Sequence, residues 1–128
     1  IKCIDKHDYF SMWNKTVDVL HWHNDVVSLP EGAQPLARSA KTKVQAFRFG
    51  SALGMQFHLE VTPTMLEEWL DESSMVKDLK AAGGSKSQLR EAFAEYNPQL
   101  QPLADQVFSS FAARCNSYEQ SLLQAQQG

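Results

Sequence analysis

The sequence changes character near residue 62, from short β-type segments to amphipathic helical patterns. Residues 1–60 carry brief apolar alternations separated by turn residues, which is typical of strands. From residue 62 onward, apolar side chains recur at helical spacing. Strands first and helices afterwards leave little alternating βαβ signal, so we expect the closing half of an α/β domain rather than a whole one.

The clearest strand pattern is a predicted hairpin in the middle of the chain. The segment 44–49 alternates cleanly and stops at Gly50-Ser51, and the segment 53–57 follows at once. This spacing predicts two antiparallel strands joined by a tight turn, with residues 52–55 forming a buried apolar face. Shorter extended pieces are expected at residues 17–22 and 36–39.

Four helices are expected after the strands. The first has Thr62 as its cap and Pro63 in its first turn, the second stops at Gly83-Gly84, the third opens at Ser87, and the fourth starts at Pro102. The apolar stripe of the fourth comprises Leu103, Val107, Phe108, Phe111, Cys115, Tyr118 and Leu122. We expect this stripe to dock on a sheet face.

Composition narrows the class of protein. A chain of 128 residues with 43% hydrophobic residues suits one globular domain with a core. A net charge of -3 gives no reason to expect nucleic acid or an anionic membrane as partner. No apolar run approaches the roughly 20 residues of a membrane helix. Cys3 and Cys115 are expected as reduced thiols in a cytoplasmic protein, with a disulfide as the alternative. Ile1 is not an initiator methionine, so we expect residues upstream of it.

The run from Gly54 to Glu60 ends in a histidine and a carboxylate two positions apart. Residues i and i+2 of a strand leave on the same side, so His58 and Glu60 can meet where a buried strand ends. A carboxylate beside an imidazole fixes its tautomer and stabilises its charged form. The spacing therefore predicts an acid–base histidine at the end of a strand.

These two residues belong to a longer ordered series. The series comprises Trp22-His23-Asn24-Asp25, Leu29-Pro30-Glu31-Gly32-Ala33, Ala37-Arg38-Ser39, Gln45-Ala46-Phe47 and Gly54-Met55-Gln56-Phe57-His58-Leu59-Glu60-Val61-Thr62. It resembles the C-terminal half of class I (triad-type) glutamine amidotransferase domains, most closely the GMP-synthase-like branch. The resemblance is best over residues 20–70. Leu59 stands where family members commonly have proline, a departure known in that branch.

The resemblance implies a flavodoxin-like α/β fold and a glutaminase. A cysteine on a nucleophile elbow would attack the side-chain amide of glutamine, releasing ammonia for an acceptor. His58 would be the general base and acid, and Glu60 would orient it. Trp22, His23, Asn24 and Asp25 would border the glutamine site. No cofactor or metal is implied, and the partners would be a synthetase or the missing N-terminal half, or a second copy of the chain.

The chain has no residue that looks like the nucleophile. An elbow needs small residues around the nucleophile because the turn is sharp. Cys3 lies between Lys2 and Ile4, and Cys115 lies within a predicted helix, where a small core hydrophobe is the expectation. We therefore expect residues 1–128 to be the C-terminal part of one amidotransferase domain, with the elbow outside this chain.

Three alternatives stay open. The same triad in relatives hydrolyses γ-glutamyl amides or peptides without ammonia transfer. A truncated, non-catalytic module would keep the fold and lose the chemistry. A zinc site would use His21, His23, His58 and Glu60, although no cysteine ligands accompany them.

Overall fold

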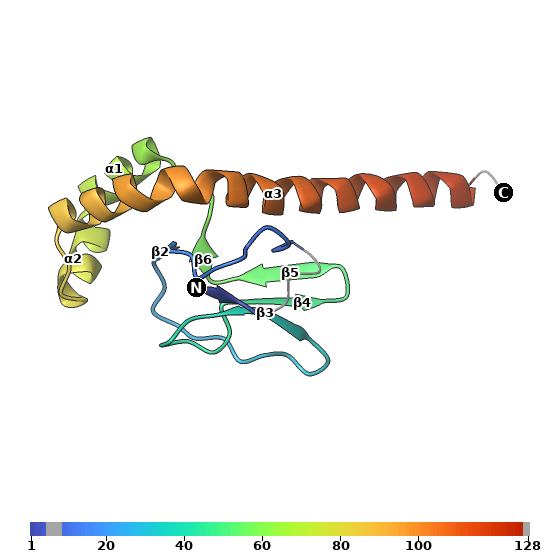
Figure 1. The fold of residues 1–128 in the computed structure, drawn as a ribbon, viewed down its shortest axis with the longest axis horizontal. Helices are drawn as coiled ribbons and strands as arrows, with labels where there is room; N and C mark the ends of the chain where they lie inside the picture. Colours follow the sequence, from blue (N-terminus) through green and yellow to red (C-terminus); the bar gives the residue numbers. More distant parts are fainter. Residues whose placement is uncertain (5–8, 127–128) are drawn as a thin grey trace.

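The computed structural model describes residues 1–4 and 9–126, in which every strand precedes every helix, as predicted (Figure 1). The strands are β1 (Lys2–Cys3), β2 (Leu20–His21), β3 (Gln34–Arg38), β4 (Ala46–Phe49), β5 (Ala52–Met55) and β6 (Phe57–His58). The helices are α1 (Pro63–Asp71), α2 (Ser73–Ala81) and α3 (Lys86–Gln126).

The strands form two small antiparallel sheets. The larger has the order β1-β3-β4-β5, and the smaller pairs β2 with β6. The buried apolar face predicted for residues 52–55 is wrong, because Ala52 is exposed and the other three residues are only partly buried. The predicted hairpin itself is confirmed: Phe49 pairs with Ala52, and Gly50 takes φ 57° in the tight turn between β4 and β5. Glycine suits this position because its lack of a Cβ permits a positive φ. Of the extended piece expected at residues 17–22, only Leu20–His21 pairs as a strand.

The start of α1 and the end of α2 lie where the sequence predicted. The Thr62 hydroxyl accepts a hydrogen bond from the Met65 N–H at 3.2 Å, and Pro63 stands at the start of α1. After α2, Gly83 takes φ 80°, and the N–H of Gly84 donates to the Leu79 carbonyl at 2.9 Å. A left-handed glycine with this bond satisfies carbonyls that a helix end leaves without a partner.

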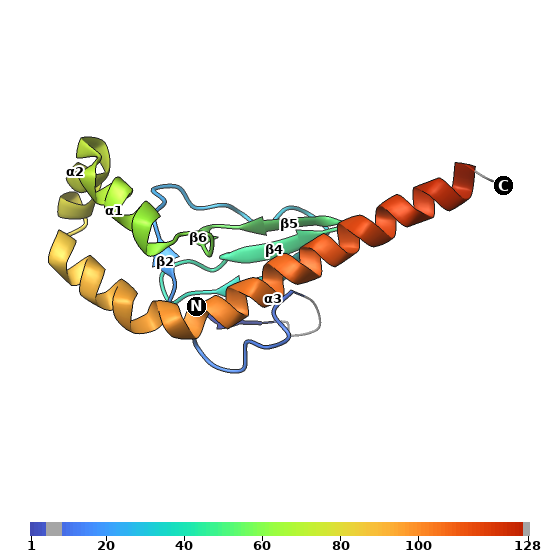
Figure 2. The ribbon, with the colours of Figure 1, turned by 90° about the horizontal axis from the view of Figure 1, so that it is seen from above.

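The two helices expected after residue 84 form one continuous helix, α3, so the predicted start at Pro102 is wrong. Pro98 and Pro102 both lie inside it, and Figure 2 shows that the helix is curved rather than straight. Proline fixes φ near the helical value but removes an N–H donor, which bends a helix without always ending it. Packing of Leu100 and Ala104 against the core on either side of Pro102 favours continuation.

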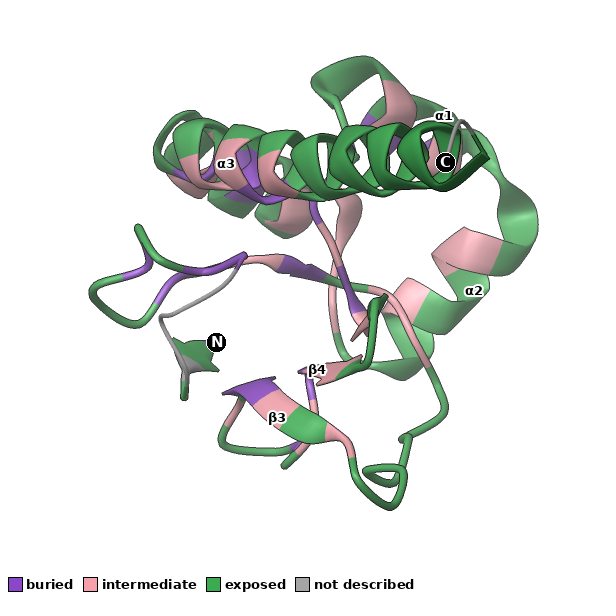
Figure 3. Cartoon of the chain, turned by 90° about the vertical axis from the view of Figure 1, so that its right-hand side faces the viewer, coloured by how far each residue is buried: buried purple, intermediate pink, exposed green. Residues whose placement is uncertain are grey.

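The apolar stripe of α3 is buried over only part of its length. Val107 is 1% exposed, whereas Phe108 and Phe111 are each 44% exposed. We call residues 108–126 the far half of α3; residues 111–126 are all exposed, and the last turns extend beyond the sheet (Figures 1 and 3). The first turns still contact the Tyr9 ring, which lies 6.3 Å from the Phe111 ring and 4.9 Å from the Arg114 guanidinium. The exposed large apolar side chains of the far half are Phe108, Phe111, Tyr118, Leu122 and Leu123.

The expectation that the whole stripe docks on a sheet is therefore wrong beyond Val107. The core-hydrophobe interpretation of Cys115 is also wrong, because this residue is an exposed free thiol. Helical spacing selects the face of α3, but the last turns of the far half have no sheet beneath them within the described residues. Only a surface that reaches that far could bury the stripe.

Two hydrophobic clusters hold α3 to the strands. One gathers Tyr9, Phe10 and Trp13 with Phe57 and Val107. The other contains Leu20, Val61, Leu66, Leu70 and Phe93. Burying a large apolar side chain stabilises a fold by about 1.5–3 kcal/mol. The two clusters flank β6, so they fix the strand that carries His58.

Candidate functional site

His58 is the last residue of β6, and its ring contacts Glu60. The His58 Nδ1 lies 2.6 Å from the Glu60 Oε1, which confirms the predicted contact. The His58 side chain is 27% exposed and that of Glu60 is 49% exposed. An ionised carboxylate can only accept, so Nδ1 carries the proton and Nε2 of the neutral ring carries a lone pair.

The contact does not arise from strand alternation, as the sequence argument assumed. Strand β6 ends at His58, and Glu60 lies in the bend that follows. The Leu59 N–H donates to the Glu60 Oε2 at 3.0 Å, which turns the carboxylate back toward the strand end. Leu59 is buried at 4% exposure and anchors this bend.

The Glu60 carboxyl has a lowered pKa. Partial burial raises its pKa, but the hydrogen bond from His58 and the backbone N–H bonds outweigh that effect. The carboxylate is therefore charged at neutral pH and able to orient an imidazole. We call Gln56–Val61, together with Trp22 and Trp69, the His58 corner.

Trp69 packs against the imidazole, and Trp22 packs against Trp69. The Trp69 ring on α1 meets the His58 ring edge-on, with centroids 5.1 Å apart. The Trp22 ring meets Trp69 in the same manner at 5.6 Å. Edge-to-face pairs of this kind contribute about 0.5–1.5 kcal/mol beyond burial. Trp69 therefore connects His58 to the segment proposed from the sequence to border a substrate.

That segment runs from Trp22 to Asp25. It is held in place by Gln56, to which the sequence analysis gave no role. The Gln56 Nε2 donates to the Asp25 carbonyl at 2.9 Å, and the Gln56 Oε1 accepts from the Val27 N–H at 3.3 Å. His23 Nδ1 lies 2.8 Å from the same Asp25 carbonyl. Asn24 is exposed. A sequence signal for this role existed, because Gln56 is the first residue of the segment Gln56-Phe57-His58-Leu59-Glu60.

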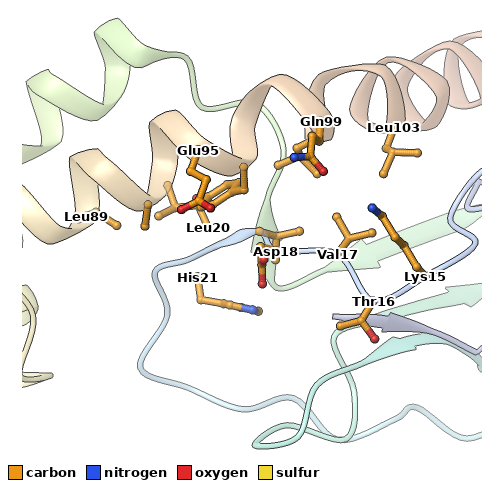
Figure 4. A pocket seen from close by; sticks show the side chains of 14 residues that line it. Lys15, Thr16, Val17, Asp18, Leu20, His21, Leu89, Glu95, Gln99 and Leu103 are labelled. Atoms are coloured by element: carbon orange, nitrogen blue, oxygen red, sulfur yellow. The ribbon is translucent and has the colours of Figure 1, made fainter.

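Two hollows lie beside the corner. The larger, about 500 Å³, opens between residues 15–21 and α3, with Lys15 at one end and Glu95 and His21 toward the other (Figure 4). Burial there, with the negative charge of Asp18, raises the pKa of Tyr96 to about 12. The smaller, about 140 Å³, is lined by Trp22, His23 and Asn24 and by α2. The residues that line them do not include His58 or Glu60, so the acid–base pair lies outside both hollows.

His21 at the end of β2 and His23 just after it were the core of the zinc alternative. The rings of His21 and His23 lie 5.8 Å apart, edge to face. The pKa of His21 is lowered, first by burial and then by neighbouring positive charge, including that of His23 and His58. Within residues 1–4 and 9–126, no three His, Cys, Asp or Glu side chains gather as ligands for a metal ion.

In the same described residues, no helix combines the length and apolar character that crossing a membrane requires.

Comparison with known proteins identifies the family to which the chain belongs. The profile of the family "Glutamine amidotransferase class-I" matches residues 1–76, more than half of the chain. The chain therefore belongs to the class I glutamine amidotransferase family. No curated protein matches the sequence.

The fold also matches a solved structure. A glutamine amidotransferase from Thermotoga maritima superposes with a TM-score of 0.76 and 24% sequence identity. The match covers 86% of this chain and 47% of that protein, so the chain spans about half the length of that relative. This likeness confirms the predicted α/β amidotransferase fold.

Proposed function

We propose that this chain is the C-terminal part of an amidotransferase domain in the GMP-synthase-like branch, and that it supplies the acid–base pair of a Cys-His-Glu triad. The observation that carries the proposal is the 2.6 Å contact between His58 Nδ1 and Glu60 Oε1 at the end of β6. With Nδ1 bonded to the carboxylate, Nε2 is the nitrogen that can accept a thiol proton.

In the proposed reaction, His58 takes the proton of a cysteine thiol, and the thiolate attacks the side-chain carbonyl carbon of glutamine. His58 then delivers the proton to the departing nitrogen as the C–N bond breaks, which releases ammonia and leaves a thioester. Water attacks the thioester, and glutamate is released. Glu60 keeps the ring oriented and stabilises its charged form. No cofactor takes part, and the ammonia passes to an acceptor on a synthetase partner.

We assign the substrate-bordering role to Trp22, His23, Asn24 and Asp25. In support, this segment lies beside the corner through the Trp22–Trp69 contact and the two bonds from Gln56. A segment whose carbonyl and amide groups are already oriented suits recognition of a polar amide substrate.

We assign the nucleophile to an N-terminal half outside this chain. Neither cysteine lies between small residues, and Cys115 is exposed on the far half of α3. The exposed stripe of the far half suits a surface that meets another part of the same domain. The two widely separated cysteines are our ground for proposing a reducing, cytoplasmic setting.

The test compares the 128-residue chain alone with the chain joined to, or coexpressed with, an N-terminal half that carries the elbow. We expect the chain alone to release no ammonia from glutamine. The assembled protein should release it, and His58→Asn should lower kcat/KM by roughly a thousandfold, the scale of general acid–base catalysis. His21→Asn is the matched control and should stay within about twofold, because His21 is outside the proposed triad.

Each other outcome contradicts a part of the proposal. Ammonia release by the chain alone, abolished by Cys115→Ser, would place the nucleophile here. Activity of the assembled protein that survives His58→Asn would remove the catalytic role of that residue. Faster cleavage of a γ-glutamyl peptide than of glutamine would favour the hydrolase alternative. An inactive assembly would favour the non-catalytic module.

A further inference from the structure

The side chain of Gln56 bridges the strand junction before His58 to the segment at residues 23–27. Its amide group uses both ends: Nε2 donates to the Asp25 carbonyl at 2.9 Å, and Oε1 accepts from the Val27 N–H at 3.3 Å. One primary amide thereby engages two peptide groups of the same segment. A carboxylate or an alkyl group of the same size could not make both bonds.

His23, within the segment, donates a second hydrogen bond to the same carbonyl. Its Nδ1 lies 2.8 Å from the Asp25 carbonyl oxygen, which can only accept, so Nδ1 carries a proton. The 3.5 Å approach of Gln56 Nε2 to that Nδ1 is then a contact between two donors, not a bond. The Asp25 carbonyl thus receives one donor from its own segment and one from the strand junction.

Gln56 is itself fixed to the larger sheet. Its backbone N–H donates to the Gln45 carbonyl at 2.9 Å, just before β4. The segment that it holds has little apolar anchoring, since Val26 is 67% exposed and Val27 is 39% exposed. Where side chains do not pack, the position of a loop depends on its polar bonds.

We propose that Gln56 is a positioning residue that sets the affinity for glutamine by holding residues 23–27 beside the strand that carries His58. The inference rests on the proposed function for the identity of the substrate. It adds a role for the first residue of the Gln-Phe-His-x-Glu motif, which takes no part in the proton transfers. Its loss should weaken binding and leave the chemical step intact.

The structural part of the inference is tested on the chain itself by amide hydrogen exchange. Gln56→Leu should raise the exchange rate of the Val27 N–H roughly tenfold, because the bonded acceptor is gone. Gln56→Glu keeps an acceptor for Val27 and should leave this rate within about threefold of wild type. Gln101→Leu is the matched control, because Gln101 is exposed on α3 and its side-chain amide donates to the Asn97 Oδ1 one turn earlier in the same helix. Unchanged Val27 exchange in Gln56→Leu would overturn the bridging role.

The functional part is tested by glutaminase kinetics of the assembled protein. Both Gln56→Leu and Gln56→Glu should raise KM for glutamine roughly tenfold with kcat within about twofold, since each removes the donor to Asp25. The Gln101→Leu control should match wild type. If Gln56→Leu fails to fold, the KM of Gln56→Glu for glutamine alone tests the functional part.

The outcomes separate this inference from the proposed function. A wild-type assembly that is active, but whose KM is unchanged by both Gln56 variants, would overturn the inference and leave the triad intact. A fall in kcat at constant KM would overturn it as well, because it would place Gln56 in the chemical step. A wild-type assembly without glutaminase activity would overturn the proposed function and with it the substrate role of residues 23–27, whereas Val27 exchange would still decide whether Gln56 holds that segment.

Discussion

The His58 corner and the far half of α3 differ in what their contacts require. In the corner, the contact between His58 and Glu60 joins residues only two positions apart in the chain. In the far half, Phe108, Tyr118 and Leu122 are all exposed, although they continue a stripe in which Leu103 is partly buried and Val107 is buried. Local polar contacts can thus assemble without the rest of a domain, whereas an apolar face needs a second surface at the right distance.

The largest change in stability is expected for a leucine in the buried part of α3, compared with a leucine in its far half. Leu100→Ala, in the buried part of α3, should lower the free energy of unfolding by about 2–5 kcal/mol, because it leaves a cavity in the core. Leu122→Ala, the same change in the far half, should alter it by less than about 0.5 kcal/mol. Urea denaturation of both variants measures the contrast. Equal losses would show that the far half is covered in solution.

A variant in the far half tests whether its exposed stripe is buried when the chain meets an N-terminal half. Phe108→Ser should change the stability of the chain alone by less than about 1 kcal/mol, since the ring is 44% exposed. Its affinity for an N-terminal half should fall by about 1–3 kcal/mol if the ring is buried on association. Titration calorimetry with the isolated half measures this loss. Unchanged affinity would mean that the far half meets something else.

A variant at the Thr62 cap tests whether the position of the His58 ring depends on helix α1. Thr62→Ala removes the hydroxyl that accepts from the Met65 N–H, and should destabilise the chain by about 1 kcal/mol. The ring-proton shifts of His58 in NMR spectra should change with it, because α1 carries Trp69. Serine at the same position should restore both readouts.

The smallest effect concerns the pH dependence of stability. The folded pKa of Glu60 lies below its ordinary value of 4.5, so the unfolded chain binds this proton more readily. The contribution of Glu60 is therefore present above pH 4.5 and is lost as pH falls through the lowered pKa. The difference in urea midpoint between wild type and Glu60→Gln should shrink from about pH 6 to about pH 3. A difference that grows on acidification would contradict this sign.

What the sequence predicted follows the same division between local and distant contacts. The hairpin, the Thr62 cap and the Gly83 helix end depend on neighbours within a few residues, and each is where the pattern placed it. The contact between His58 and Glu60 was also predicted, although through strand alternation rather than the bend that forms it.

The errors have tertiary causes. Proline chemistry predicted a break near Pro102, but packing on both sides of it keeps α3 continuous. Periodicity predicted that the stripe would be covered, but it carries no information on how far the sheet extends. The role of Gln56 was missed because its partners lie about thirty residues earlier in the chain.

The length of α3 beyond its last buried residue has a mechanical consequence. At 1.5 Å per residue, the stretch from Val107 to Gln126 projects about 28 Å. Ala104 and Val107, which follow both prolines, are buried, so the projection bends at Val107, where the packing ends, and not at Pro98 or Pro102. A change of about 10° in the bend there would carry the tip through about 5 Å, so the helix acts as a lever that converts a small angular change into a displacement larger than a side chain.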